Sequence, residues 1–150
     1  MLDLLEGRSV LPRLKAGSKS ELLSLLAGRA AERTGIDPVL ITQALFERER
    51  LGTTGVGGGV AIPHARLTGL DRRYAMFAQL AHPIAFEAID DHPVDLLFLV
   101  LSPEGRDAEH LKTLSRISRL LRDSALCAKL RQAATQDGLH DLLTQRLLAA

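Results

Sequence analysis

The stretch "VDLLFLVLSP", residues 94–103, contains an unbroken apolar run from Leu96 to Leu101. A short continuous run of this kind, bounded by turn residues, is typical of a strand that is buried on both faces of a sheet. Residues 94–101 are therefore predicted to form a buried strand. Such a strand needs apolar cover on each side, which helices elsewhere in the chain would supply.

Helix signals lie on both sides of this strand. Ser18 and Glu21 match a capping box and predict a helix that ends at Gly35. Asp37, followed by a proline, is expected to cap a second helix that ends near Gly52. The last third of the chain has a helical pattern. The helices expected there cover residues 108–122, residues 125–133 and the residues from 137 onward.

Extended segments lie between the two groups of helices. The segments "VAI" at residues 60–62, "RYAMFAQL" at residues 73–80 and "IAF" at residues 84–86 have the composition of strands. A turn at Asp90–Asp91 leads into the buried strand. Helices, then strands, then helices predict an α/β fold: a single domain over residues 1–150, with a mixed β-sheet flanked by helices on both sides.

Composition excludes several classes of protein. The chain has 150 residues, a formal net charge of +1 and 3% aromatic residues, unlike a nucleic-acid-binding protein with a basic face and stacking aromatics. Asp3 and Glu6 stand where a signal peptide would carry basic residues, and no window is apolar enough for a membrane span. The one cysteine, Cys127, is expected to be a buried free thiol, which suits a reducing compartment. We therefore expect a cytoplasmic protein with no nucleic-acid partner and no membrane insertion.

The segment "GVGGGVAIPHAR", residues 55–66, combines three consecutive glycines with a Pro-His pair. It lacks the lysine and hydroxyl residue of a Walker phosphate loop, and it precedes a strand where a dinucleotide fingerprint would precede a helix. The remaining interpretation is that the glycines free space beside His64 for another backbone or a phosphoryl group. Because Pro63 restricts the backbone and favours an extended Ile62, His64 is expected to be held rigidly at the edge of a strand.

Read from Glu49, "ERLGTTGVGGGVAIPHA" resembles the phosphorylation-site signature of phosphotransferase-system (PTS) enzyme IIA domains of the fructose/mannitol class, and most closely their nitrogen-regulatory branch. The segments "SKSELLSLLAGRAAERTGID", "PIAFEAIDDHPVDLLFLVLSPEG" and "HLKTLSRISRLLRD" also resemble family segments, so the similarity covers nearly the whole chain. The resemblance implies the fold of the mannitol-type enzyme IIA. Arg66 departs from it, since a lysine is common there.

The resemblance implies that His64 accepts a phosphoryl group from a phosphohistidine carrier protein of the HPr or NPr type. A neutral imidazole nitrogen would attack the phosphorus, and the transferring group mainly needs in-line positioning and hydrogen-bond donors. Because one nitrogen–phosphorus bond replaces another of similar energy, the expected transfer is reversible. It needs no metal, ATP or other cofactor.

Three further residues are predicted to support this site. His110 follows the expected helix cap Asp107, and a helix N-terminus favours a neutral imidazole and a nearby anion. Arg48 continues the inner face of the second helix, where an arginine needs an anionic partner. The family has an active-site histidine and an arginine at these two positions. Thr54 could donate its hydroxyl to the phosphate. The simpler interpretations are a satisfied buried histidine, a cation at a helix C-terminus and a packed turn residue, respectively.

The helix face of His110 is predicted to be apolar. Its members are Leu111, Leu114, Ile117 and Leu121. Other titratable residues are weaker candidates, since His82, His92 and His140 are expected at the surface and Asp90 and Asp91 point apart on a turn. The paired histidines of the predicted site lack a third ligand for zinc, so we expect no metal site.

The leading hypothesis is a phosphocarrier whose phosphorylation on His64 signals nitrogen or potassium status to regulatory proteins, such as potassium-transport proteins or sensor kinases. One alternative is a sugar-specific enzyme IIA that passes the group to an enzyme IIB. Another is a binding module that uses the same surface without phosphoryl transfer. Whether this PTS component is best described as an enzyme stays open, because its role as a phosphohistidine intermediate would be mainly regulatory.

Overall fold

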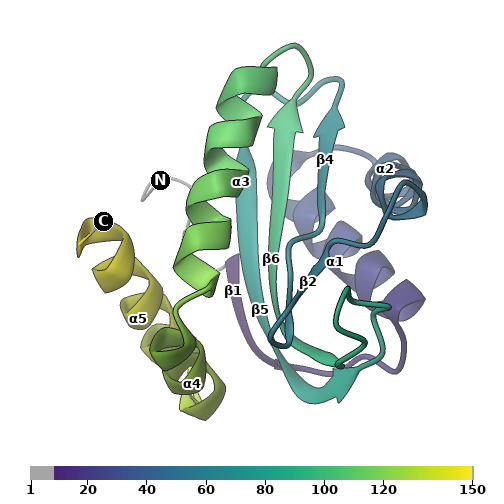
Figure 1. The fold of residues 1–150 in the computed structure, drawn as a ribbon. Coiled ribbons are helices and arrows are strands. Elements are labelled where there is room, and N and C mark those ends of the chain that lie inside the picture. Colours follow the sequence, from purple (N-terminus) through teal and green to yellow (C-terminus); the bar gives the residue numbers. More distant parts are fainter. Residues whose placement is uncertain (1–8, 150) are drawn as a thin grey trace.

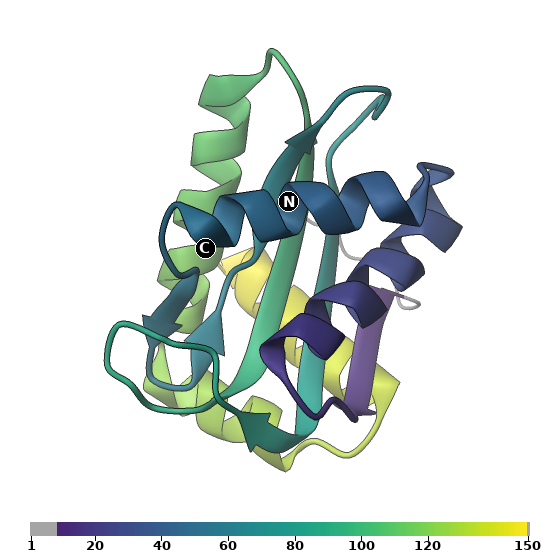
Figure 2. The same ribbon diagram turned by 90° about the vertical axis from the view of Figure 1, so that its right-hand side faces the viewer.

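Helices cover both faces of a six-stranded sheet in the computed structural model, which describes residues 9–149 (Figures 1 and 2). The strands are β1 (Val10–Leu14), β2 (Gly55–Gly57), β3 (Val60–Ala61), β4 (His64–Leu67), β5 (Tyr74–Ile84) and β6 (Val94–Pro103). The helices are α1 (Lys19–Thr34), α2 (Pro38–Arg50), α3 (Asp107–Leu121), α4 (Ser124–Gln132) and α5 (Gln136–Ala149). Asp3 and Glu6, on which the absence of a signal peptide was argued, lie outside the described residues.

The predicted buried strand is the centre of the sheet. The strand order is β1-β5-β6-β3-β2, and β4 pairs with β6 beyond the end of β3. β6 runs antiparallel to β5 and parallel to β3 and β4, while β1 runs parallel to β5. Each side chain from Leu96 to Leu101 is at most 1% exposed. The predicted α/β fold with a mixed sheet is therefore confirmed.

Alternate side chains of β6 pack against two separate helix layers, because neighbouring residues of a strand point to opposite faces. The core beneath α1 and α2 receives Leu97, Leu99 and Leu101. The core beneath α3, α4 and α5 receives Leu96, Phe98 and Val100. Figure 1 shows these two helix groups on opposite sides of the sheet, as the sequence predicted. No helix in the described part of the chain combines the length and the apolar character that crossing a bilayer requires.

The helix boundaries follow local capping signals, with one exception. Ser18 accepts a hydrogen bond from the amide of Glu21 at the start of α1, and Gly35 ends the helix with a φ of 75°. Asp37 caps α2 as predicted. The expectation that Asp107 caps α3 is wrong. Asp107 is the first helical residue, and the preceding Arg106 occupies the cap position without a side-chain hydrogen bond.

The three glycines form the tip of the β2–β3 hairpin rather than a gap beside His64. Gly57, Gly58 and Gly59 have φ values of 98°, 66° and 79°, a region that favours glycine. The amide of Gly58 donates to a carboxylate oxygen of Asp90 at 3.0 Å, and a guanidinium N–H of Arg131 donates to the Gly58 carbonyl at 2.7 Å. These glycines do not line the groove around His64. The predicted steric role is therefore wrong, and the glycines serve hairpin geometry.

Three strands escaped the sequence analysis. β2, at Gly55–Gly57, lies in the glycine-rich segment, for which no strand was expected. β1 contains Pro12 and lies at the edge of the sheet, the position in which a strand tolerates proline. β4 is only four residues long and pairs with the second half of β6. Cys127, in contrast, is the buried free thiol that was expected, and it contacts the carbonyl of Leu121.

Candidate functional site

His64 is positioned by a break between two short strands on the same side of β6. β3 pairs with Leu96 and Leu97, and β4 resumes the pairing at His64 opposite Val100. Pro63, in the break, lacks an N–H, but its carbonyl accepts from the amide of Val100 at 3.0 Å. The backbone on which His64 stands is thus fixed by the sheet. The expected placement of this histidine at a strand edge agrees with the structure.

The two ring nitrogens of His64 have partners of opposite kind. Nδ1 lies 2.8 Å from the carbonyl oxygen of Ile62, which can only accept a hydrogen bond. Nε2 lies 3.1 Å from Nε of Arg48, which can only donate one. The proton therefore belongs on Nδ1, and the lone pair on Nε2. This is the neutral tautomer, with Nε2 as the nucleophilic atom.

The surroundings of His64 favour this neutral form. Burial lowers the pKa of His64 below its ordinary value of 6.5, and the positive charge of Arg48 acts in the same direction. The hydrogen bond to Ile62 and the negative charge of Glu49 oppose this shift without reversing it. At neutral pH the ring is therefore uncharged and able to act as a nucleophile.

His110 is held by the end of β6. It is 7% exposed, and its Nδ1 lies 2.5 Å from the hydroxyl oxygen of Ser102. This nitrogen is the one hydrogen-bond partner of the buried hydroxyl in the described part of the chain, so Ser102 donates to Nδ1 and the ring proton lies on Nε2. Nε2 of His110 has no hydrogen-bond partner within residues 9–149. Since every buried side-chain nitrogen or oxygen in this range has a partner, the Nε2–H is not buried and is accessible from the groove. Burial, followed by the nearby His64, lowers the pKa of His110.

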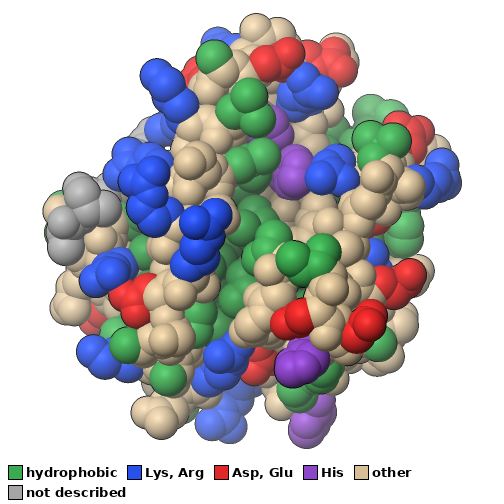
Figure 3. All heavy atoms as spheres, viewed as in Figure 1, with side chains coloured by type: hydrophobic (Ala, Val, Ile, Leu, Met, Phe, Trp, Pro, Cys, Tyr) green, Lys and Arg blue, Asp and Glu red, His purple; other side chains and the backbone are tan. Residues whose placement is uncertain are grey.

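The two histidines meet in an open groove between α2 and α3. Their ring centroids are 5.4 Å apart, with an angle of 55° between the ring planes. The groove has a volume of about 1080 Å³. Its apolar lining consists of Ala44, Leu51, Ala65, Leu111 and Leu114. In Figure 3, histidine and basic side chains gather at the upper end of an apolar strip that runs beside α3.

Three arginines line this groove, Arg48, Arg50 and Arg66, as do three carboxylates, Glu47, Glu104 and Asp107. Of these arginines, Arg48 and Arg66 are the two whose side chains have a hydrogen-bond or ion-pair partner within residues 9–149. Arg48, from the last turn of α2, contacts Nε2 of His64 and donates a second hydrogen bond to the carbonyl of Gly52 at 2.9 Å. Arg66, from β4, lies 2.5 Å from a carboxylate oxygen of Asp107. These two arginines line the groove together with His64 and His110. The sequence analysis did not assign Arg66 to the site, although its position two residues after His64 on one strand places it on the same face.

Thr54 lies behind the site. Its hydroxyl donates to the carboxylate of Glu49, its amide contacts the same carboxylate at 3.1 Å, and it does not line the groove. Glu49 also forms an ion pair with Lys19 at 2.9 Å. Thr54 therefore ties the end of α2 to β2, and the structure does not bring it together with His64, His110 and Arg48.

The remaining candidates lie elsewhere. His82 and His92 are exposed, as expected, and His140 is half-buried on α5. The carboxylate of Asp90 accepts from the amides of Gly58 and His92, which lowers the pKa of Asp90. Leu111 does not share the buried face of His110, since it is 65% exposed at the groove. Ser102 was missed, although it is the first polar residue after the apolar run that predicts β6.

This fold, with its groove of two histidines and three arginines, agrees with the comparison to known families. The family model described as "Phosphoenolpyruvate-dependent sugar phosphotransferase system, EIIA 2" matches residues 3–146. The chain therefore belongs to the type-2 enzyme IIA family of the phosphotransferase system.

Within this family, the chain is homologous to nitrogen regulatory proteins. The chain is 48% identical over 141 residues to a nitrogen regulatory protein of Bradyrhizobium diazoefficiens, covering 94% of this chain and 92% of the relative. The crystal structure of nitrogen regulatory protein IIA-Ntr from Neisseria meningitidis superposes with a TM-score of 0.90 at 29% identity, covering 95% and 97% of the two chains. The fructose-specific EIIA component of Haloferax volcanii is 39% identical over 136 residues, covering 89% of this chain and 85% of the relative.

Proposed function

We propose that the chain is a phosphocarrier in which Nε2 of His64 accepts a phosphoryl group from an HPr- or NPr-type carrier protein. Partner proteins that respond to nitrogen or potassium status would then read the phosphorylation state. The observation that carries this proposal is the complementary hydrogen bonding of the two histidines. Nε2 of His64 carries a lone pair, which accepts from Arg48 in the free protein, and Nε2 of His110 carries an N–H.

The proposed transfer balances without a separate base. The Nε2 lone pair of His64 attacks the phosphorus as the nitrogen–phosphorus bond of the carrier breaks. The electron pair of that bond goes to the carrier's imidazole, which carries a proton on its other nitrogen and therefore leaves as the neutral ring. The proton on Nδ1 stays in place and continues to donate to Ile62, which stabilises the positive charge that develops on the ring. Because His64 is neutral beforehand, no deprotonation step is needed.

The neighbouring groups suit the charge that the phosphoryl group brings. Arg48 occupies the Nε2 lone pair in the free protein, so it must move to a phosphoryl oxygen as the new bond forms. The Nε2–H of His110 supplies a second donor at a ring separation of 5.4 Å. Positioned donors of this kind provide most of the catalysis in phosphoryl transfer.

The rim of the groove suits a protein donor and protein readers. Leu51 is 85% exposed and Leu111 is 65% exposed, on opposite walls of the groove. Exposed leucines around a charged centre are typical of surfaces that bind other proteins. Phosphorylation adds a charge of about −1.5 to −2 at this centre. A partner that contacts both leucines would therefore meet a distinctly more negative centre after transfer than before it.

Intact-mass measurement tests the proposal. The protein is incubated with phosphoenolpyruvate, enzyme I and an HPr-type carrier, and we expect an acid-labile gain of about 80 Da, one phosphoryl group. His64→Ala should abolish the gain, while His82→Ala, which removes an exposed histidine, should retain it. An acid-labile gain in the His64→Ala protein would refute His64 as the acceptor.

A sugar-specific role is the second candidate, and two observations favour it. The matching family is described as a sugar phosphotransferase system, and one relative carries the name of a fructose-specific component. The same groove would then pass the phosphoryl group to an enzyme IIB. Rapid loss of the group on addition of fructose- or mannitol-type IIB domains would support this role, and retention of the group would support the regulatory one.

A further inference from the structure

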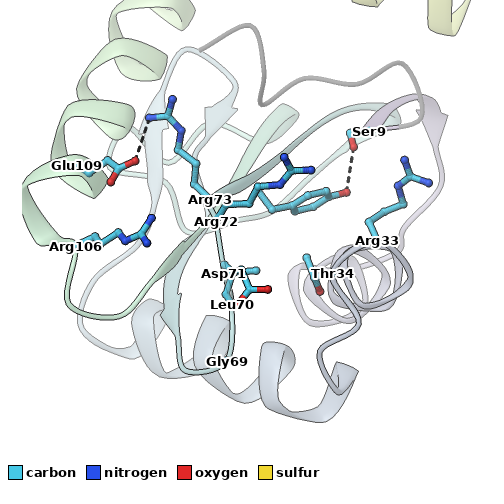
Figure 4. Close-up of a pocket in the computed structure, with 11 residues that line it drawn as sticks. Ser9, Arg33, Thr34, Gly69, Leu70, Asp71, Arg72, Arg73, Arg106 and Glu109 are labelled. Carbon is cyan, nitrogen blue, oxygen red and sulfur yellow. Dashed lines mark hydrogen bonds and ion pairs between the residues drawn. The ribbon is translucent and has the colours of Figure 1, made fainter.

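A second pocket, of about 330 Å³, lies beside the first turn of α3 (Figure 4). Most of its lining comes from three parts of the fold: the end of α1, the loop that joins β4 to β5, and the start of α3. Ser9 and Tyr74 complete it. Arg33, Arg72 and Arg106 enter it from these three elements. None of its lining residues is shared with the groove of His64.

The pocket gathers positive charge. Four arginines line it, Arg33, Arg72, Arg73 and Arg106, against two carboxylates, Asp71 and Glu109. Arg73 is held in place by the hydroxyl of Thr113 at 3.1 Å and by the carboxylate of Glu109 at 3.9 Å. The N-terminus of α3 adds the partial positive charge of the helix dipole.

Two of the arginines have no side-chain partner in the described part of the chain. Across residues 9–149, the side chains of Arg72 and Arg106 make neither a hydrogen bond nor an ion pair. Guanidinium groups that are brought together from separate elements repel one another, and an anion between them removes this repulsion. In Figure 4, Arg106 and Arg33 approach the pocket from opposite sides, with Arg72 between them.

We propose that this pocket binds a small phosphate monoester at a site separate from His64. Arginine forks match phosphate oxygens in geometry and form charge-assisted hydrogen bonds with them. Leu70 and the ring of Tyr74 provide apolar surface for the organic part of the ligand. The volume of about 330 Å³ is at the lower end for ligand sites, which favours a phosphorylated metabolite of a few carbons over a nucleotide.

The location of the pocket links it to the groove through one helical turn. Glu109 lines the pocket and His110, the next residue, lines the groove. The first turn of α3 thus contacts both the proposed ligand and the proposed phosphoryl site. Binding itself does not depend on phosphoryl transfer at His64, so the two proposals can fail separately.

The test uses the full chain with 3-phosphoglycerate and inorganic phosphate as probes. We expect 3-phosphoglycerate to shift the amide NMR signals of residues 69–74 and of the first turn of α3 in a saturable way. Arg72→Gln/Arg106→Gln should weaken its binding in calorimetry by roughly tenfold or more, since each lost contact is charge-assisted. Arg116→Gln/Arg119→Gln removes the same charge from exposed positions outside both cavities and should leave the affinity within about twofold. His64→Ala should also bind normally.

Four results would overturn the proposal. The first is the absence of saturable shifts with 3-phosphoglycerate at millimolar concentration. The second is equal affinity in the wild type and in Arg72→Gln/Arg106→Gln. The third is a set of shifts that is confined to the groove and lost in His64→Ala. The fourth is equal affinity for inorganic phosphate, which would reject the organic part of the ligand.

Discussion

The hydroxyl of Ser102 lies 2.5 Å from Nδ1 of His110. The same ring nitrogen of His64, Nδ1, is hydrogen-bonded to the carbonyl of Ile62. The two histidines are thus both fixed through Nδ1, but in opposite senses. His110 accepts from a hydroxyl, and His64 donates to a carbonyl. Since the rings are 5.4 Å apart, a group between them can be attacked by one and hydrogen-bonded by the other.

Ser102→Ala should therefore change the tautomer of His110. Without the hydroxyl, Nδ1 of His110 has no hydrogen-bond donor. The ring proton, which is on Nε2 in the wild type, can then also occupy Nδ1. We expect ¹⁵N NMR spectra of the imidazole to show a mixture of the two tautomers. Phosphorylation of His64 should be slower by about five- to tenfold, which corresponds to the free energy of roughly one hydrogen bond. Ser115→Ala, at an exposed position of α3, is the control. An unchanged His110 tautomer in Ser102→Ala would contradict this positioning role.

Arg48→Gln should slow phosphorylation and raise the pKa of His64. Arg48 is a direct hydrogen-bond partner of Nε2, and loss of one such donor to a phosphoryl transition state costs on the order of a hundredfold in rate. The positive charge of Arg48 helps to lower the pKa of His64, so its removal should raise that pKa in an NMR titration. Arg50→Gln is the control, because Arg50 also lines the groove but does not contribute to the lowered pKa of His64. It should leave that pKa unchanged. An equal rise in both variants would refute the assignment.

The stability of the protein should fall as the pH falls below 6.5. His64 and His110 both have lowered pKa values in the folded state, so the unfolded chain binds protons at a pH where the folded chain does not. Their contribution is therefore complete above pH 6.5 and is lost as the pH falls toward the lowered folded values. Urea midpoints measured between about pH 7.5 and about pH 5.5 should decrease, and the decrease should be smaller in His64→Asn. The same slope in both proteins would contradict the linkage.

Local signals predicted the elements whose ends and burial are decided locally. The caps at Ser18 and Asp37 and the apolar run of β6 are each readable from a few neighbouring residues. β4 could not be found in this way, because His64–Leu67 is a strand only through its pairing with β6. The same limit applied to the glycine tip, whose partners Asp90 and Arg131 lie 32 and 73 residues further along the chain from Gly58.

The site was predictable in its residue types but not in its hydrogen bonding. The resemblance to the enzyme IIA family indicated His64, His110 and Arg48, and the structure brings these three together. Which nitrogen of each ring carries the proton depends on Ile62 and on Ser102, and no sequence pattern specifies those contacts. Thr54 lies near His64 in sequence, yet its side chain faces Glu49.

Thr54→Val should lower stability without affecting phosphorylation. Valine matches threonine in shape but removes the hydroxyl donor from the Glu49 carboxylate, whose side chain is only 7% exposed. A buried carboxylate that loses a donor costs about 1–3 kcal/mol of unfolding free energy. The rate of phosphorylation should stay within about threefold, because Thr54 does not line the groove. Thr54→Ser should restore stability, and a large loss of rate in a folded Thr54→Val protein would return Thr54 to the site.

Gly55→Ala should destabilise the protein more than Gly58→Ala, although only Gly58 has a positive φ. A Cβ on Gly55 would lie 2.8 Å from Cβ and 2.9 Å from Cα of Ala88, so the backbone itself must move. A Cβ on Gly58 meets nothing within 4 Å, so its cost is the left-handed conformation alone, about 1–2 kcal/mol. Urea denaturation should therefore give the larger loss for Gly55→Ala, at about 2–4 kcal/mol. If Gly58→Ala were the more damaging change, the hairpin rather than its packing against Ala88 would limit stability.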